Sequence, residues 1–217
     1  MKLMTQLLGM AILPFLLSSC STNQSKIEAT FEDLIVDISN ADIDGIYANL
    51  DPQSTKYLDS LAQRIKRGSW DDASALGAST QIELTTLFLY EQIQDAVASS
   101  KEFSGQDVLF VMYLNGIGIL RSAGANKLAI REMGRITNYN ADVKVRVPTG
   151  GNAAIVSTYK FTKVNQDWKL NLPSTLSLNE KLLKGQYQRS GMSKLLFIQN
   201  YVANTPDQVE FKYRTRK

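Results

Sequence analysis

The apolar positions in the first third of the chain follow a helical period. They recur at intervals of three and four residues, at Ile27, Phe31, Leu34, Ile35 and Ile38. This spacing places apolar side chains on one face of a helix and leaves the intervening acidic side chains on the other. We therefore predict a helix that begins near Lys26 and ends at the polar break Asn40-Ala41-Asp42.

Further helical segments follow in the same half. Asp42 is placed to cap a short helix that reaches Leu50, and Asp51-Pro52-Gln53-Ser54 resembles a turn into the next helix, whose inward positions are Tyr57, Leu58, Leu61 and Ile65. The polar stretch 68–80 predicts a loop, and residues 80–99 predict a helix. The run from Val108 to Leu114 is almost continuously apolar, and its extension to Leu120 favours a buried helix over a strand.

The pattern changes to strict alternation in the second half. Val143, Val145 and Val147 alternate with charged residues, and two later segments, 155–161 and 168–172, alternate in the same way. Turn sequences at 148–152 and 165–167 separate them, and a preceding strand is expected within 128–140. Pro173 should end this meander, and helices are expected at about 176–188 and 192–203. The fold class is therefore α+β: N-terminal helices, a curled antiparallel sheet of three to four strands, then C-terminal helices.

The first residues have the order of a secretion signal. Lys2 precedes an apolar run from Leu7 to Leu17, and small residues follow it. This run has about eleven residues, whereas a membrane-spanning helix needs roughly twenty. The segment is therefore typical of a cleaved signal peptide and too short for a stable membrane anchor.

The sequence Leu17-Ser18-Ser19-Cys20 resembles the lipobox of bacterial lipoproteins. The resemblance implies cleavage after Ser19, acylation of Cys20, and attachment to a lipid bilayer through that residue. Ser21, in place of an inner-membrane retention Asp, implies the outer membrane, with the protein facing the periplasm. The alternative is an ordinary secreted protein with a coincidental Cys at its cleavage site. The expected organisation is a signal peptide (1–19), a polar tether (20–25), a single α+β domain (26–205) and a polar basic tail (206–217).

Composition restricts the chemistry. The chain contains no His and only one Cys, which the lipobox would use. This removes the commonest general base, the Ser–His and Cys–His nucleophile systems and most zinc sites. No nucleotide motif is present, so no cofactor, no metal site and no catalytic residue is assigned. Without Lys2 the net charge is 23 − 21 = +2, too small to indicate nucleic acid as a partner.

The charges are unevenly distributed. Residues 24–60 carry eight acidic and two basic side chains, whereas residues 171–217 carry eight basic and three acidic ones. The simplest interpretation is that these are solvated faces that partly complement each other in the fold. A second interpretation is that the basic tail contacts anionic lipid or an acidic protein.

Part of the chain resembles the cone-shaped fold of nuclear transport factor two and ketosteroid isomerase. The resemblance depends on residues 47–52 leading into Tyr57-Leu58, and on the strands 154–164 and 167–172. It implies a pocket between sheet and helices, where an enzyme would need an acid or base and an oxyanion donor. Asp44 with Tyr47, or Tyr139 with Arg131, are the candidate pairs. The alternative is that Tyr47 is a core aromatic residue, and that Asp42 and Asp44 cap a helix.

Two functions remain open on the sequence. The first is a non-enzymatic envelope lipoprotein with a binding or assembly role, whose partner is an envelope protein or a small hydrophobic ligand. The second is a cone-fold enzyme that acts on a small hydrophobic molecule. A closed pocket with a desolvated ionisable group would favour the enzyme, and a filled core with an exposed apolar patch would favour the binding protein.

Overall fold

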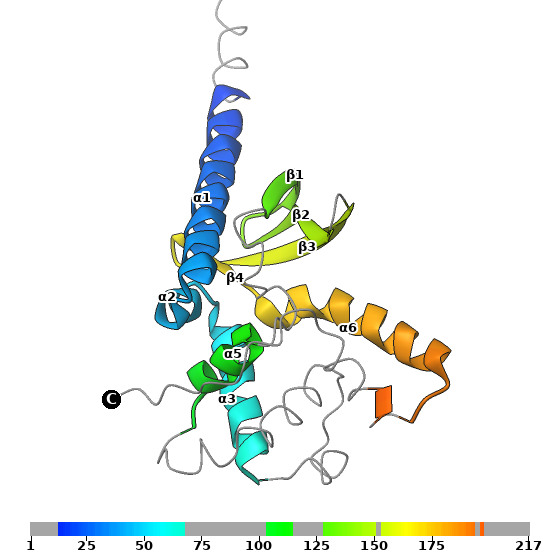
Figure 1. Cartoon of the computed structure of the whole chain (residues 1–217). Helices are drawn as coiled ribbons and strands as arrows, with labels where there is room; N and C mark the ends of the chain where they lie inside the picture. Colours follow the sequence, from blue (N-terminus) through cyan, green and yellow to red (C-terminus); the bar gives the residue numbers. More distant parts are fainter. Residues whose placement is uncertain (1–12, 68–102, 115–127, 151–152, 194–195, 198–217) are drawn as a thin grey trace, which may run out of the picture.

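The computed structural model describes residues 13–67, 103–114, 128–150, 153–193 and 196–197 (Figure 1). Its elements in chain order are α1 (Leu13–Asn40), α2 (Ile43–Ala48), α3 (Pro52–Arg67), α5 (Gly105–Leu114), β1 (Ala129–Ile136), β2 (Asn140–Gly150), β3 (Ala153–Val164), β4 (Asp167–Leu170) and α6 (Leu172–Ser190). The predicted α+β class and the order of helices, sheet and helix are confirmed. The loop 68–80, the helix 80–99, the tail 206–217 and most of the signal peptide lie outside the described residues.

The N-terminal helix is longer than its apolar period predicts. Its buried residues include Ile27, Phe31, Leu34 and Ile38, as expected. The helix nevertheless begins at Leu13 and continues through residues 20–25, the segment expected to be a tether. No Gly or Pro interrupts α1 after Pro14, which the first turn of a helix tolerates. Asn23 Oδ1 also accepts a hydrogen bond from Lys163 Nζ at 3.3 Å, which joins this part of α1 to β3.

The short helix α2 begins as the sequence predicts. The Asp42 side chain caps it by accepting a hydrogen bond from the amide of Gly45 at 3.0 Å. Gly45 lies directly against Asp37 of α1, because a Cβ at this position would be only 2.6 Å from the Asp37 carboxyl carbon. The absent side chain therefore lets α2 pack closely on the end of α1.

The four described strands form one antiparallel sheet in the order β1-β2-β3-β4. Its inner face is apolar, with paired positions Val143↔Tyr159 and Phe161↔Leu170 buried against the helices. The pairing of β1 with β2 shifts register twice, after Ile130 and after Met133. Such bulges bend a strand, and they explain why the sheet curls beside α1 without closing (Figure 1).

The link from β4 into α6 differs from the prediction. The sequence predicts that Pro173 separates the sheet from a helix at about 176, but α6 already begins at Leu172. The Asn171 side chain caps α6 by accepting a hydrogen bond from the Ser174 amide at 2.9 Å. Proline is suited to the first turn of a helix, since its missing amide hydrogen has no helical partner there. Gly191, with φ of 66°, ends the helix in the left-handed conformation.

Ser157 offers a simple test of the core. It is 6% exposed on the inner face of β3, opposite Val145, and its hydroxyl has no hydrogen-bond partner among the described residues. A buried polar group without a partner is destabilising, so Ser157→Ala is expected to raise the free energy of unfolding by about 1 kcal/mol. Urea denaturation would measure this, with Thr158→Ala on the other face as the control. A loss of stability in Ser157→Ala would contradict the prediction.

Candidate functional site

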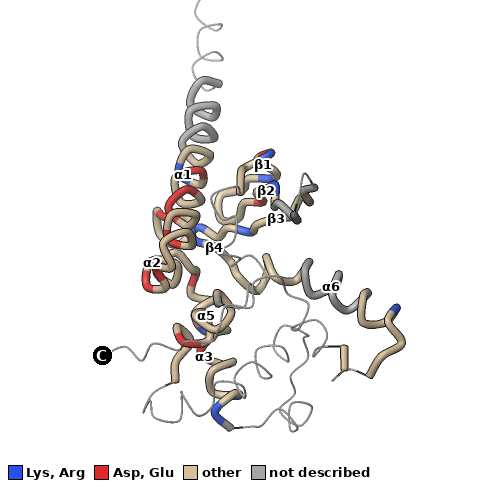
Figure 2. Tube along the Cα trace, viewed as in Figure 1, with Lys and Arg blue, Asp and Glu red and all other residues tan. Residues whose placement is uncertain are grey.

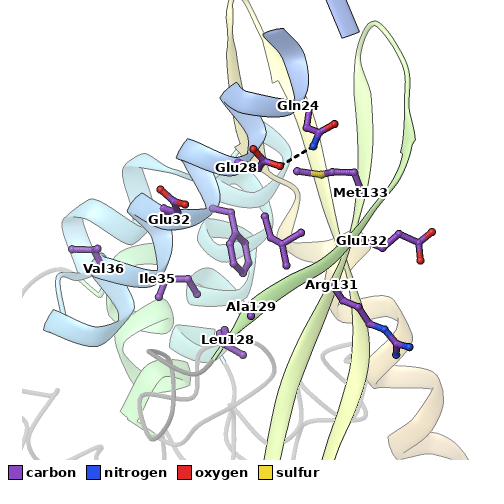
Figure 3. A pocket seen from close by; sticks show the side chains of 12 residues that line it. Gln24, Glu28, Glu32, Ile35, Val36, Leu128, Ala129, Arg131, Glu132 and Met133 are labelled. Atoms are coloured by element: carbon purple, nitrogen blue, oxygen red, sulfur yellow. Dashed lines mark hydrogen bonds between the residues drawn. The ribbon is translucent and has the colours of Figure 1, made fainter. Parts of the chain in front are cut away.

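A groove lies between α1 and the edge strand β1. We call it the α1–β1 groove, and its cavity volume is about 680 Å³. One wall is formed by Gln24, Glu28, Phe31, Glu32, Ile35 and Val36 of α1, and the other by residues 128–133 at and before the start of β1 (Figure 3). Its size is within the range of roughly 300–1,000 Å³ that is usual for ligand sites.

The lining residues indicate that the groove follows the edge of β1. Side chains alternate between the two faces of a strand, yet all residues from Leu128 to Met133 line the groove. Met133 points toward α1, whereas Glu132 points away from it (Figure 3). A groove that meets both faces of a strand must run past its edge. Among the described strands, β1 pairs only with β2, so this edge has no partner strand.

The floor of the groove is apolar and uncharged. Phe31 is 3% exposed and packs edge-on against Tyr159, with ring centroids 5.8 Å apart. Burial raises the pKa of the Tyr159 hydroxyl well above its ordinary value, which by itself already keeps a tyrosine neutral at physiological pH. Ile35 and Met133 are partly buried beside this core, and Val36 is 55% exposed at one end.

The charged groups lie at the rim. Glu28 accepts a hydrogen bond from Gln24 Nε2 at 2.9 Å, and Glu32 lies one helical turn further along α1. On the opposite wall, Glu132 Oε2 forms an ion pair with Lys144 Nζ at 2.9 Å. Arg131 is the basic residue that lines this wall. Figure 2 shows the wider pattern, with acidic residues gathered on α1 and α2 and basic residues on the strands.

The members of the first pair proposed from the sequence, Asp44 and Tyr47, each interact with a residue of another helix. Asp44 accepts a hydrogen bond from Gln106 of α5 at 3.2 Å. Tyr47 lies near Asp59 of α3; burial, followed by the negative charge of Asp59, raises the pKa of its hydroxyl. Asp59 also accepts the amide of Gly105 at 3.1 Å. These side chains join helices to one another, which agrees with the structural interpretation of Tyr47.

The second pair, Tyr139 with Arg131, is not brought together. Tyr139 is 71% exposed in the turn between β1 and β2, beyond the last residue of β1. Arg131 lies near the other end of β1, five residues before Ile136. Of the four candidate side chains, only Arg131 belongs to the α1–β1 groove.

A second polar cluster is buried rather than open. We call it the Asp51–Asn171 junction; its members are Asp51, Ser54, Asn171 and Thr175. Asp51 accepts hydrogen bonds from the Ser54 amide at 2.8 Å and from Asn171 Nδ2 at 2.8 Å. Thr175 donates to the Asn171 carbonyl at 2.8 Å and accepts the Lys160 amide at 2.9 Å. Since its members bond one another and adjacent backbone, the junction stabilises the fold and offers no ligand site.

The groove has only a weak signature in the sequence. The helical period predicts Ile35 on the buried face of the first helix, and it does not single out Val36 or Glu32. The only local signal is that the adjacent pair Ile35-Val36 widens the apolar face beyond the stripe at Ile27, Phe31 and Leu34. The opposite wall comes from a strand about a hundred residues later, which helical periodicity alone cannot relate to α1.

The sequence matches no protein-family model and no curated protein. In the part of the chain that the structure describes, none of the helices combines the length and apolar character needed to cross a bilayer. Within the same part, no cluster of three or more Cys, Asp or Glu side chains could hold a metal ion. Two features therefore bear on function, the sequence motif at Cys20 and the α1–β1 groove.

The side chain of Asp37, at the contact of α1 and α2, should make the stability of the fold depend on pH. Burial raises the pKa of Asp37 above its ordinary 3.8, the hydrogen bond from Asn49 at 3.0 Å lowers it, and the charges of Asp42 and Asp33 raise it again. A carboxyl group whose pKa is raised by folding contributes stability below pH 3.8, and this is lost as the pH rises through the folded pKa.

Asp37→Asn is therefore expected to be more stable than the wild type at pH 7. The amide oxygen can still accept from Asn49, and the charge that folding disfavours is gone. The difference should shrink as the pH falls through the folded pKa of Asp37 toward 3.8, because the wild-type carboxyl then becomes protonated. Thermal unfolding of both proteins across this range would measure it, and a difference that does not change with pH would contradict it.

Proposed function

We propose that the chain is a bacterial lipoprotein, anchored by acyl chains on Cys20 to the outer membrane and facing the periplasm. The observation that carries this proposal is the sequence Leu17-Ser18-Ser19-Cys20 at the end of an eleven-residue apolar run that follows Lys2. Cys20 is the only Cys in the chain, so no internal disulfide competes for its thiol. Two or three acyl chains hold a protein firmly, since each buried methylene contributes about 0.8 kcal/mol.

We further propose that the anchored domain is a non-enzymatic binding or assembly module. Support comes from the α1–β1 groove, whose floor is apolar and whose ionisable residues lie at the rim. Among the residues of α1 whose side chains the structure describes, 23–40, the first that is fully buried is Ile27, which follows Cys20 by seven positions, about 10 Å of helix. The groove would then lie close to the membrane surface, within reach of other envelope components.

Mass analysis of the mature amino-terminal peptide tests the lipoprotein proposal. The expected peptide begins at Cys20 and carries the mass of a diacylglycerol, with or without an additional amide-linked acyl chain. A mature chain that begins at another residue, or a Cys20 without added acyl mass, would overturn the proposal.

A further inference from the structure

We propose that the α1–β1 groove binds an extended segment of a partner protein as an additional strand on the edge of β1, and that Lys or Arg at alternate positions of this segment pair with Glu28 and Glu32. This inference specifies the ligand of the binding module proposed above. It depends on the lipoprotein proposal only for the location of the partner, which is the cell envelope. It commits to a basic, extended peptide as the occupant.

The edge of β1 provides the first argument. An unpaired edge presents a row of backbone amide and carbonyl groups that another strand can bond. The groove runs along this edge over residues 128–133, about 16 Å or more of extended chain. A strand added here would extend the sheet past β1 and over α1, where the described sheet remains unclosed.

The spacing of the two acidic residues provides the second argument. Glu28 and Glu32 are four residues apart on α1, which corresponds to a rise of about 6 Å. Alternate side chains of a β-strand lie about 6.6 to 6.8 Å apart on one face. Two residues at positions i and i+2 of an added strand can therefore each reach one glutamate.

The composition of the α1 wall selects the side chains that face it, whereas Arg131, the cation of the groove, belongs to the opposite wall. Phe31 and Ile35 line the groove beside the glutamates, so an inward side chain must cross apolar surface before it reaches a carboxylate. Lys and Arg do this readily, because their aliphatic stems pack on apolar surface while the charged ends remain solvated. Glu32 makes no ion pair with another described residue, so its carboxylate is available to such a cation.

A designed peptide of defined sequence can test the proposal while the natural partner is unidentified. The probe is a fluorescein-labelled eight-residue peptide of alternating Arg and Thr, and its control has the same composition with four Arg followed by four Thr. Anisotropy titrations use the full processed protein in nanodiscs of uncharged phosphatidylcholine. We expect the alternating peptide to bind about tenfold more tightly than the control.

Variants then locate the site. Glu28→Gln and Glu32→Gln should each weaken binding about threefold, the size expected of a solvated ion pair. Asp33→Asn removes the same charge from α1 at a position that does not line the groove, and it should leave binding unchanged. Two further peptides carry N-methyl groups on the odd-numbered or on the even-numbered residues. Only one of them should lose binding, since the amides of only one of these two sets face β1.

Several outcomes would overturn the inference. Equal binding of the two peptides would show attraction by charge alone, and equal losses in Asp33→Asn and Glu32→Gln would do the same. Displacement of the peptide by palmitate would assign the groove to lipid, and displacement on dimer formation would assign it to a second copy of the chain. A preparation without acyl mass on Cys20 would end the lipoprotein proposal, yet peptide binding to that preparation would still be measurable.

Discussion

Replacement of Cys20 by Ala is expected to abolish acylation and to leave the chain as an uncleaved precursor. The modification requires a sulfur nucleophile, and no other Cys exists in the chain. Without acyl chains, attachment would depend on the eleven-residue apolar run, which is too short to span a bilayer. Incorporation of a clickable palmitate analogue should fall to background, and the mobility of the protein on gels should correspond to the precursor.

The matched control is Ser18→Ala, which keeps a small residue before the cleavage site. This variant should still be acylated, cleaved and retained in the membrane pellet after a carbonate wash. Palmitate incorporation into Cys20→Ala would contradict the prediction, as would an identical cleaved product in both variants. The comparison separates loss of the thiol from a general disturbance of the signal.

Most elements can be predicted from the sequence because their cause is local. The stripe at Ile27, Phe31, Leu34 and Ile38 requires one helix face, and the alternation at 143–147 requires a half-buried strand. The cap at Asp42 is predictable for the same reason, since the side chain bonds an amide three residues away. In each case the residues that determine the structure lie within one helix or one strand.

Other features depend on contacts between distant residues. The Tyr47 hydroxyl feels the charge of Asp59, which belongs to another helix and lies twelve residues further along the chain. The first residue of α6, Leu172, donates its backbone amide to the Ser54 hydroxyl at 2.8 Å, a contact across 118 residues. The α1–β1 groove likewise requires β1 to curl beside α1. Patterns of local period contain no information about which elements will meet.

The Asp51–Asn171 junction gives the largest stability effect that we expect in the folded domain. Asp51 is 2% exposed and lies at the start of α3, where its carboxylate accepts the Ser54 amide and the Asn171 side chain. Asp51→Ala removes the cap of α3, and it leaves the Ser54 amide and the Asn171 side chain buried without the carboxylate that accepts their hydrogen bonds. We expect a loss of about 3 kcal/mol in the free energy of unfolding, a large part of the roughly 5–15 kcal/mol that is usual for a domain.

Two variants give this prediction its controls. Thr55→Ala, one residue after Ser54, removes a hydroxyl that among the described residues bonds only the Pro52 carbonyl, at 3.2 Å, and it should cost less than about 1 kcal/mol. Asp51→Asn keeps one acceptor for Ser54 but places an amide group beside the donating amide of Asn171, so its cost should be intermediate.

Urea denaturation followed by circular dichroism would rank the three variants. Equal stabilities of Asp51→Ala and Thr55→Ala would show that the junction contributes nothing beyond its local helix turn. The expected order instead means that one buried carboxylate joins the N-terminal helices to the end of the sheet, since Asn171 both bonds Asp51 and caps α6. Loss of this carboxylate should therefore weaken the attachment of α3 and α6 to β4 together, in a single unfolding transition.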